Sequence, residues 1–167
     1  GQSKDPNFVR TTQAPASILN QSISSSRRFI AESYDINRFK NVASNLGVSL
    51  NDVVLTICSG ALRNYLLALN ELPDEPLIAW VPYSMRKDGS ASGNQFAFIL
   101  CNLGTHLENP LSRLRLVHDS MNDGKQRFGR MNQSEVINYS LVSYSWELVN
   151  ILTCLLYTSP SPRDVEE

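Results

Sequence analysis

Two polar residues stand at the start of a largely apolar helical segment of the chain. The segment SLNDVVLTICSGALRNYL, residues 49–66, has apolar residues on nearly every side of a helix, yet Asn51 and Asp52 fall in its first turn. Ser49 followed three residues later by Asp52 predicts a capping box, and the carboxylate also favours the helix dipole. Capping accounts for Asp52 but leaves Asn51 unexplained, because a buried amide must find a hydrogen-bonding partner.

The histidines and cysteines form no obvious reactive constellation. His118 begins HDSMNDG in a segment with helical spacing, and we expect an ordinary surface or boundary histidine. His106 has no serine, cysteine or carboxylate pattern beside it, so a structural role is expected. The cysteines are Cys58, Cys101 and Cys154. Their spacing fits neither a metal site nor an even-numbered disulfide framework, which predicts reduced thiols and no metal.

Composition limits the classes of function. The chain has 167 residues, 42% of them hydrophobic, which suits one domain with a buried core. Its formal charge of -1 and its scattered basic residues argue against nucleic-acid binding, which requires clustered Lys and Arg. No apolar run reaches membrane-spanning length, and no signal-like segment opens the chain. We expect a cytoplasmic protein that at most sits on a membrane surface.

Periodicity predicts the elements that position these residues. The expected order is strand 27–33, helix 36–46, helix 50–69, strand 76–83, strand 96–104, helix 110–128 and helix 133–152. Asp35 and Gly47 delimit the first helix, and Asn109 caps the helix expected at residues 110–128. Gly60 has no side chain, so we expect another element to pack closely against the second helix at this position. This strand–helix–helix–strand–strand–helix–helix order is typical of an α/β or α+β fold.

The two ends differ from the middle in composition. Residues 1–26 are rich in Ser, Gln, Asn and Pro and are expected to be an interdomain linker. CLLYTSPSPRD, residues 154–164, resembles a translated sequencing adapter, so residues 154–167 are predicted to be a non-native tail. The expected domain is therefore residues 27–153.

Four blocks in order give the chain a family resemblance. SLNDVVLTICSGALRNYL, LPDEPLIAWVPYSMR, GNQFAFILCNLGTHLENPLSRL and HDSMNDGKQRF together resemble the C-terminal half of the bacterial wax ester synthase/acyl-CoA:diacylglycerol acyltransferase (WS/DGAT) family. The resemblance implies half of a two-domain fold similar to chloramphenicol acetyltransferase. It also implies an enzyme that moves a fatty acyl group from acyl-CoA to a long-chain alcohol or diacylglycerol, with no further cofactor.

The family's catalytic motif, HHxxxDG, is where this chain departs from the pattern. Its second histidine is the general base that deprotonates the acceptor hydroxyl. HDSMNDG comes close, but Asp119 stands where that histidine should be, and the segment lies downstream of the ND pair instead of upstream. The resemblance thus implies that the base belongs to an N-terminal domain missing before Gly1. We expect the fragment alone to be inactive and to expose an apolar surface.

The resemblance also suggests roles for individual residues. Asn51 would orient the reacting groups, and Asp52 would fix the start of its helix. Arg86 is a candidate for binding the CoA phosphates, with a structural salt bridge as the alternative. Asn94 is a second candidate for substrate binding, or else a turn residue. The implied partners are acyl-CoA, the acceptor lipid, the N-terminal domain and a peripheral membrane or lipid-body surface.

Two other classes of function fit parts of the pattern. A condensation-type domain acting on carrier-protein thioesters would share the fold and need the same histidine motif. A non-catalytic lipid-binding or interaction domain would need no N-terminal half, and the linker-like start of the chain argues against it.

Overall fold

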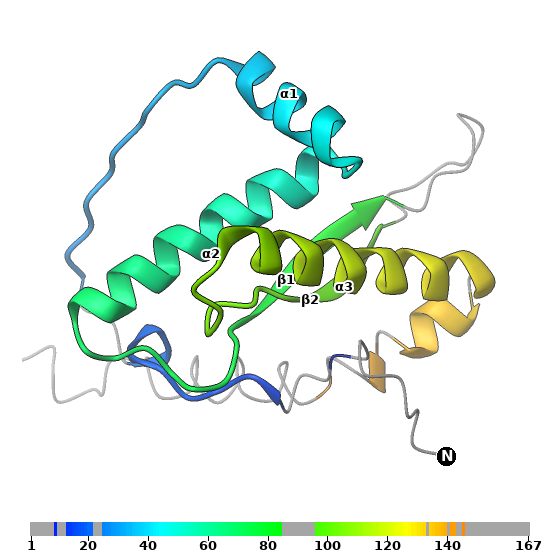
Figure 1. Cartoon of the computed structure of the whole chain (residues 1–167). Helices are drawn as coiled ribbons and strands as arrows, with labels where there is room; N and C mark the ends of the chain where they lie inside the picture. The colour runs from blue at the N-terminus through cyan, green and yellow to red at the C-terminus, as the bar shows by residue number, and fades with distance from the viewer. Residues whose placement is uncertain are drawn as a thin grey trace, which may run out of the picture. The chain divides into compact units, whose positions relative to one another are not determined.

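The computed structural model describes residues 9, 13–21, 25–84, 96–132, 134–139, 141–142 and 145 of the chain. The chain divides into two compact units, Gly1–Gly129 and Arg130–Glu167. In order, the elements are η2 (Ile18–Asn20), α1 (Ile36–Leu46), α2 (Leu50–Ala68), β1 (Ile78–Ser84), β2 (Phe96–Asn102) and α3 (Pro110–Arg130), as Figure 1 shows. Only the last residue of α3 belongs to the second unit.

The boundaries of α1 and the start of α2 follow the predicted capping signals. The Asp35 carboxylate accepts a hydrogen bond from the Asn37 N–H at 2.9 Å. Gly47 ends α1 in the left-handed region with φ 66°, which glycine adopts at low cost. At the start of α2, the Asp52 N–H donates to Ser49 Oγ at 3.2 Å, and the Ser49 N–H donates to Asp52 Oδ2 at 2.9 Å. The predicted capping box is therefore confirmed.

β1 and β2 form an antiparallel pair whose register runs from Ile78 opposite Asn102 to Ser84 opposite Phe96. Alternate side chains of β2, at Ala97, Ile99 and Cys101, are buried, as expected for a strand with one covered face. Both strands fall within two residues of their predicted bounds.

α3 covers this face of the strands (Figure 1). A Cβ atom built on Gly124 would clash with the Ile99 side chain of β2, so the helix and the strand approach closely at this point. The Ser120 hydroxyl accepts a hydrogen bond from the Asn102 N–H at 3.0 Å. Asn109 caps α3 as predicted, accepting from the N–H groups of the first turn.

Three helices share a small apolar cluster. Ala43 of α1, Val53 of α2 and Leu114 of α3 are its buried members, with Phe39 and Val48 packed against them. On the predicted apolar face of α3, the side chains of Leu114, Val117 and Met121 are buried. Leu111, also predicted on that face, is exposed because it precedes the cluster by one turn.

The strand predicted at residues 27–33 is wrong. Residues 26–35 have no regular secondary structure and lead into α1 as an extended arm (Figure 1). Phe29 and Ile30 in this arm are 90% and 83% exposed. A strand needs a neighbour to take its backbone hydrogen bonds, and in the described part of the chain β1 and β2 pair only with each other. The alternation of residue types in this segment was therefore not sufficient to indicate that it pairs with another strand.

In the second unit, the described residues 134–139, 141–142 and 145 are helical. The Asn132 N–H donates to Glu135 Oε2 at 2.8 Å, and the Glu135 N–H donates to Asn132 Oδ1 at 2.9 Å. The capping box predicted at this position is confirmed, while the rest of the predicted helix and the segment 154–167 lie outside the described residues.

Among the described residues no single helix combines the length and apolar character needed to cross a membrane, although α1 and α2 pass that test as a pair bent by 106°.

Candidate functional site

The start of α2 places a carboxylate inside the molecule. Asp52 is 1% exposed, and its Oδ2 atom lies 2.9 Å from both the Ser49 backbone nitrogen and the His118 Nδ1 atom. His118 comes from α3, 66 residues further along the chain. The second oxygen of the carboxylate, Oδ1, is buried and has no hydrogen-bond partner within the described part of the chain. The Asp52 side chain thus both caps α2 and connects α2 to α3.

Hydrogen bonds stabilise the negative charge of the buried Asp52 carboxylate. Burial raises the pKa of this carboxyl group, but the hydrogen bonds from His118 and from the Ser49 backbone and hydroxyl, with the positive charge of Lys125, lower it. The net result is a pKa below the ordinary value of 3.8. Asp52 is therefore ionised at neutral pH even though it is buried.

His118 has a partner that sequence reasoning missed. Its side chain is 37% exposed, which agrees with the expected boundary position on a helix. The expectation of an ordinary histidine is nevertheless incomplete, because its Nδ1 atom binds Asp52. One signal was available in the sequence: His118 follows the buried Leu114 by four residues, which puts both on one side of the helix.

Asn51 lies on the outside of the same helix turn. Its side chain is exposed, in contrast to Asp52 and Val53, which are buried. The predicted buried helix start therefore holds for these two residues but not for Asn51. Its amide has no hydrogen bond to another described residue, so both of its polar atoms are open to solvent or to a ligand. The other candidates, Arg86 and Asn94, lie outside the described residues.

Side-chain hydrogen bonds anchor α2 to the segment that follows β2. The buried Ser59 hydroxyl donates to the Leu103 carbonyl at 2.5 Å. Arg63 donates to the carbonyls of Thr105 and His106 at 2.7 and 3.1 Å. His106 takes part through its backbone while its side chain is exposed, in line with the structural role expected of it.

Gly60 allows α3 to approach α2, as the sequence predicted. A Cβ atom at Gly60 would lie 3.2 Å from the Arg113 guanidinium. Arg113 is itself buried and donates to the carbonyls of Leu107 and Glu108, each at 2.8 Å. These hydrogen bonds fix the Arg113 side chain against the loop before α3, and its guanidinium lies beside Gly60 of α2.

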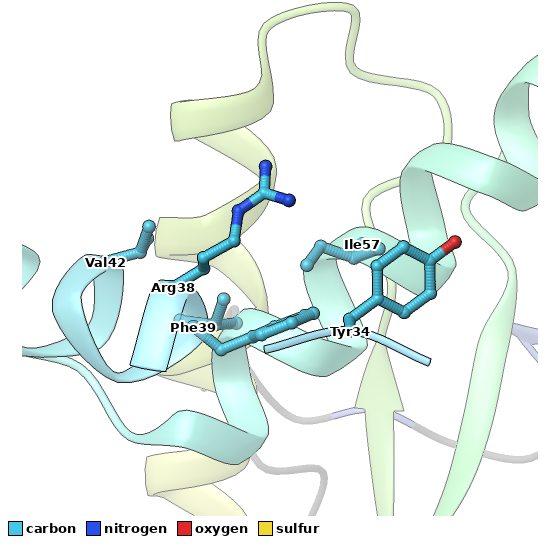
Figure 2. A pocket seen from close by; sticks show the side chains of 6 residues that line it. Tyr34, Arg38, Phe39, Val42 and Ile57 are labelled. Atoms are coloured by element: carbon cyan, nitrogen blue, oxygen red, sulfur yellow. The ribbon is translucent and has the colours of Figure 1, made fainter. Parts of the chain in front are cut away.

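A groove of about 370 Å³ lies between α1 and α2. Its lining residues are Tyr34, Arg38, Phe39, Val42, Val53 and Ile57. Figure 2 shows the Arg38 side chain extending outward from α1, away from Phe39. The rings of Tyr34 and Phe39 are arranged edge to face, with their centroids 6.3 Å apart. Such a surface can take an apolar ligand segment, and Arg38 places a positive charge at its edge.

The comparisons with known proteins agree with the resemblance. Residues 92–158 match the family model of the WS/DGAT C-terminal domain, and residues 2–54 match that of the wax ester synthase/diacylglycerol acyltransferase catalytic domain. The chain is similar to "O-acyltransferase WSD" of Acinetobacter baylyi, with 50% identity over 153 residues. That match covers 92% of this chain and 33% of the relative.

A solved structure supports the same assignment. The wax ester synthase/diacylglycerol acyltransferase from Marinobacter aquaeolei VT8 matches with a TM-score of 0.69 and 36% identity, over 78% of this chain and 29% of that one. This match confirms the expected α/β acyltransferase fold class. The chain spans about a third of the length of the curated relatives it matches. The relatives named here are acyltransferases, which act on an acyl donor and an acceptor. The chain belongs to the wax ester synthase/diacylglycerol acyltransferase family.

Proposed function

We propose that this chain forms part of an O-acyltransferase that moves a fatty acyl group from acyl-CoA to a long-chain alcohol or to diacylglycerol. The observation that carries the proposal is the 50% identity to O-acyltransferase WSD over 92% of the chain. The products would be a wax ester or triacylglycerol together with free CoA. The names of the matched relatives favour this reaction over condensation of carrier-protein thioesters and over lipid binding without catalysis.

In the proposed reaction the general base is a histidine of an HHxxxDG motif outside these 167 residues. It removes the proton of the acceptor hydroxyl, whose oxygen attacks the thioester carbonyl, and the CoA thiolate leaves and takes up a proton. General-base assistance typically contributes about 10²- to 10⁴-fold in rate. This chain would supply Asn51 to orient the reacting carbonyl or the acceptor, Asp52 to hold the start of α2, and Arg86 and Asn94 to bind the acyl-CoA.

The proposed place of action is the cytoplasm, at the surface of the inner membrane or of a lipid body. Both proposed acceptors are lipids, and the arm before α1 exposes Phe29 and Ile30 almost completely. Exposed apolar side chains of this kind adhere to lipid surfaces. Flotation with phosphatidylglycerol-containing vesicles tests the location, since a protein that stays at the bottom of the gradient contradicts it.

A chimera tests the reaction. In it, this chain replaces the segment that it matches in the Acinetobacter enzyme, and CoA release from palmitoyl-CoA is measured with hexadecanol or with dipalmitoylglycerol. We expect acceptor-dependent release of CoA. The control replaces the second histidine of the host HHxxxDG motif by alanine, which should abolish the release. A chimera that folds, by circular dichroism and gel filtration, but releases no CoA with either acceptor contradicts the proposed function.

A further inference from the structure

The contact between Asp52 and His118 indicates which ring nitrogen of the histidine carries a proton. An ionised carboxylate can only accept hydrogen bonds, so the His118 Nδ1 atom at 2.9 Å must be the donor. The neutral ring then carries its proton on Nδ1 and leaves Nε2 unprotonated. A hydrogen bond at one ring nitrogen commonly fixes the tautomer of a histidine in this way.

His118 matters to Asp52 because the carboxylate has few other donors. Oδ2 receives the Ser49 N–H and His118, while Oδ1 is buried without a partner among the described residues. Removing His118 would leave the buried carboxylate with only Ser49 as a hydrogen-bonding partner, which is unfavourable for a buried charge. The start of α2 would have to shift or admit water.

Asn51 precedes Asp52 in the same helical turn, so any such shift moves it too. The helix is held further along by Ser59 and Arg63, which bond to residues 103–106. The first turn therefore depends on its own cap, on the packing of Val53 and on His118. A chain of contacts runs from His118 to Asp52, to the Ser49 backbone and so to the turn that carries Asn51.

We propose that His118 is a positioning residue of the acyltransferase site: its Nδ1–H holds the Asp52 carboxylate and thereby fixes the helix turn that presents Asn51. The inference rests on the proposed function for the role of Asn51 and on the contacts above for the role of His118. His118 acts through Asp52 and takes no proton from the substrate.

The tautomer can be read directly in the full chain. The chain contains two histidines, so a sample labelled with ¹⁵N-histidine gives two sets of ring signals. We expect long-range ¹H–¹⁵N correlations to show His118 as the Nδ1–H tautomer. His106, whose side chain is exposed, serves as the reference. Asp52→Ala should return His118 to the pattern of the reference. A wild-type His118 that already shows that pattern overturns the inference.

The role in the reaction is tested in the chimera with three variants of His118 and one control variant. Asparagine places an amide N–H close to the position of Nδ1 but cannot ionise, whereas glutamine places its amide near Nε2. We expect His118→Ala to lower kcat by about tenfold to hundredfold, the scale of an active-site group displaced by about 1 Å, with little change in KM. His118→Asn should recover most of that loss, and His118→Gln should not. His106→Asn is the matched control and should leave kcat unchanged.

Each outcome separates the two proposals. An inactive wild-type chimera contradicts the proposed function and leaves the tautomer experiment to judge the contact. An active chimera in which His118→Ala keeps full kcat overturns the positioning role alone. If His118→Asn is as inactive as His118→Ala while both melt at the wild-type temperature, the ring itself is required and the inference is wrong.

Discussion

At the scale of single residues, the Asp52 carboxylate joins parts of the chain that are 66 residues apart. It caps its own helix through Ser49 and binds His118 from α3. Local sequence rules identify the first contact, because Ser49 and Asp52 are only three positions apart. They cannot identify the second, which depends on how two distant helices cross. For the same reason the exposure of Asn51 was not predictable from its position in an apolar segment.

Replacing Asp52 by asparagine should lower the free energy of unfolding at pH 7 by about 1–2 kcal/mol, because a cap and a charge-assisted hydrogen bond are weakened. Urea unfolding followed by Trp80 fluorescence, in a Trp146→Phe background, measures the change. Asp35→Asn is the matched control, since asparagine caps a helix about as well as aspartate. Equal losses in both variants would contradict a special role for Asp52.

The stability lost in Asp52→Asn should also depend on pH. The pKa of Asp52 is lower in the folded chain than its ordinary value of 3.8, so the unfolded chain binds the proton more readily. Its contribution is therefore complete above pH 3.8 and is lost as the pH falls through the folded value. The difference between the wild type and Asp52→Asn should shrink over that acidic range. A difference that stays constant from pH 7 to pH 2 would contradict this origin.

The two described cysteines should differ sharply in reactivity. Burial raises the pKa of the Cys101 thiol to about 12, and its side chain is fully buried, whereas Cys58 is exposed. The thiolate is the reactive form, so Cys101 should be inert at pH 8. In a Cys154→Ser background, we expect iodoacetamide to modify Cys58 within minutes and Cys101 only in denaturant, as mass spectrometry would show. Modification of both at equal rates would contradict the buried position.

At the scale of elements, the helices were predicted well and the first strand was not. Asp35, Gly47 and Asn109 mark helix ends through contacts within a few residues, so their signals are complete in the sequence. A strand has no such signal of its own, because its hydrogen bonds go to another segment. Residues 27–33 show the alternation but lack a described neighbour, and they remain an extended arm.

The contact of α3 with β2 depends on the absence of a side chain at Gly124. Gly124→Ala should destabilise the chain by about 1–3 kcal/mol, because the new Cβ would collide with Ile99. Gly129→Ala on the same helix is the matched control, since nothing lies within 4 Å of its Cβ position. Alanine there should be neutral or stabilise by up to about 1 kcal/mol. Thermal or urea unfolding of the pair measures the difference, and a neutral Gly124→Ala would contradict the close contact.

At the scale of the whole molecule, the chain corresponds to about a third of its relatives and carries several exposed apolar side chains. Phe29 and Ile30, next to each other in the arm, are the most exposed of them. The resemblance predicted an exposed apolar surface where an N-terminal domain would pack, and that the arm belongs to such a surface stays a prediction. The arm was expected to be a strand, which would have turned one of the two side chains inward.

The arm should control how the isolated chain associates. Phe29→Ser with Ile30→Ser should reduce light scattering and the apparent size on gel filtration, because contiguous exposed apolar groups promote association. The melting temperature should not change, since neither side chain packs in the core. Leu111→Ser, a single exposed apolar residue of α3, is the control and should leave association as it is. Unchanged association in the double variant would contradict the role of the arm.

From the sequence separation of the contacts that hold α2 in place, we expect an order of folding. α1 and α2 are neighbours in the sequence and can pair early, whereas Ser59–Leu103, Arg63–Thr105 and Asp52–His118 join residues separated by 44, 42 and 66 positions. Contacts over such separations form late, because the intervening chain must lose its conformational freedom before they are made. The Asp52–His118 contact at the turn that carries Asn51 is therefore completed only when α3 docks. During synthesis, it stays unfinished until the ribosome has released the residues beyond His118.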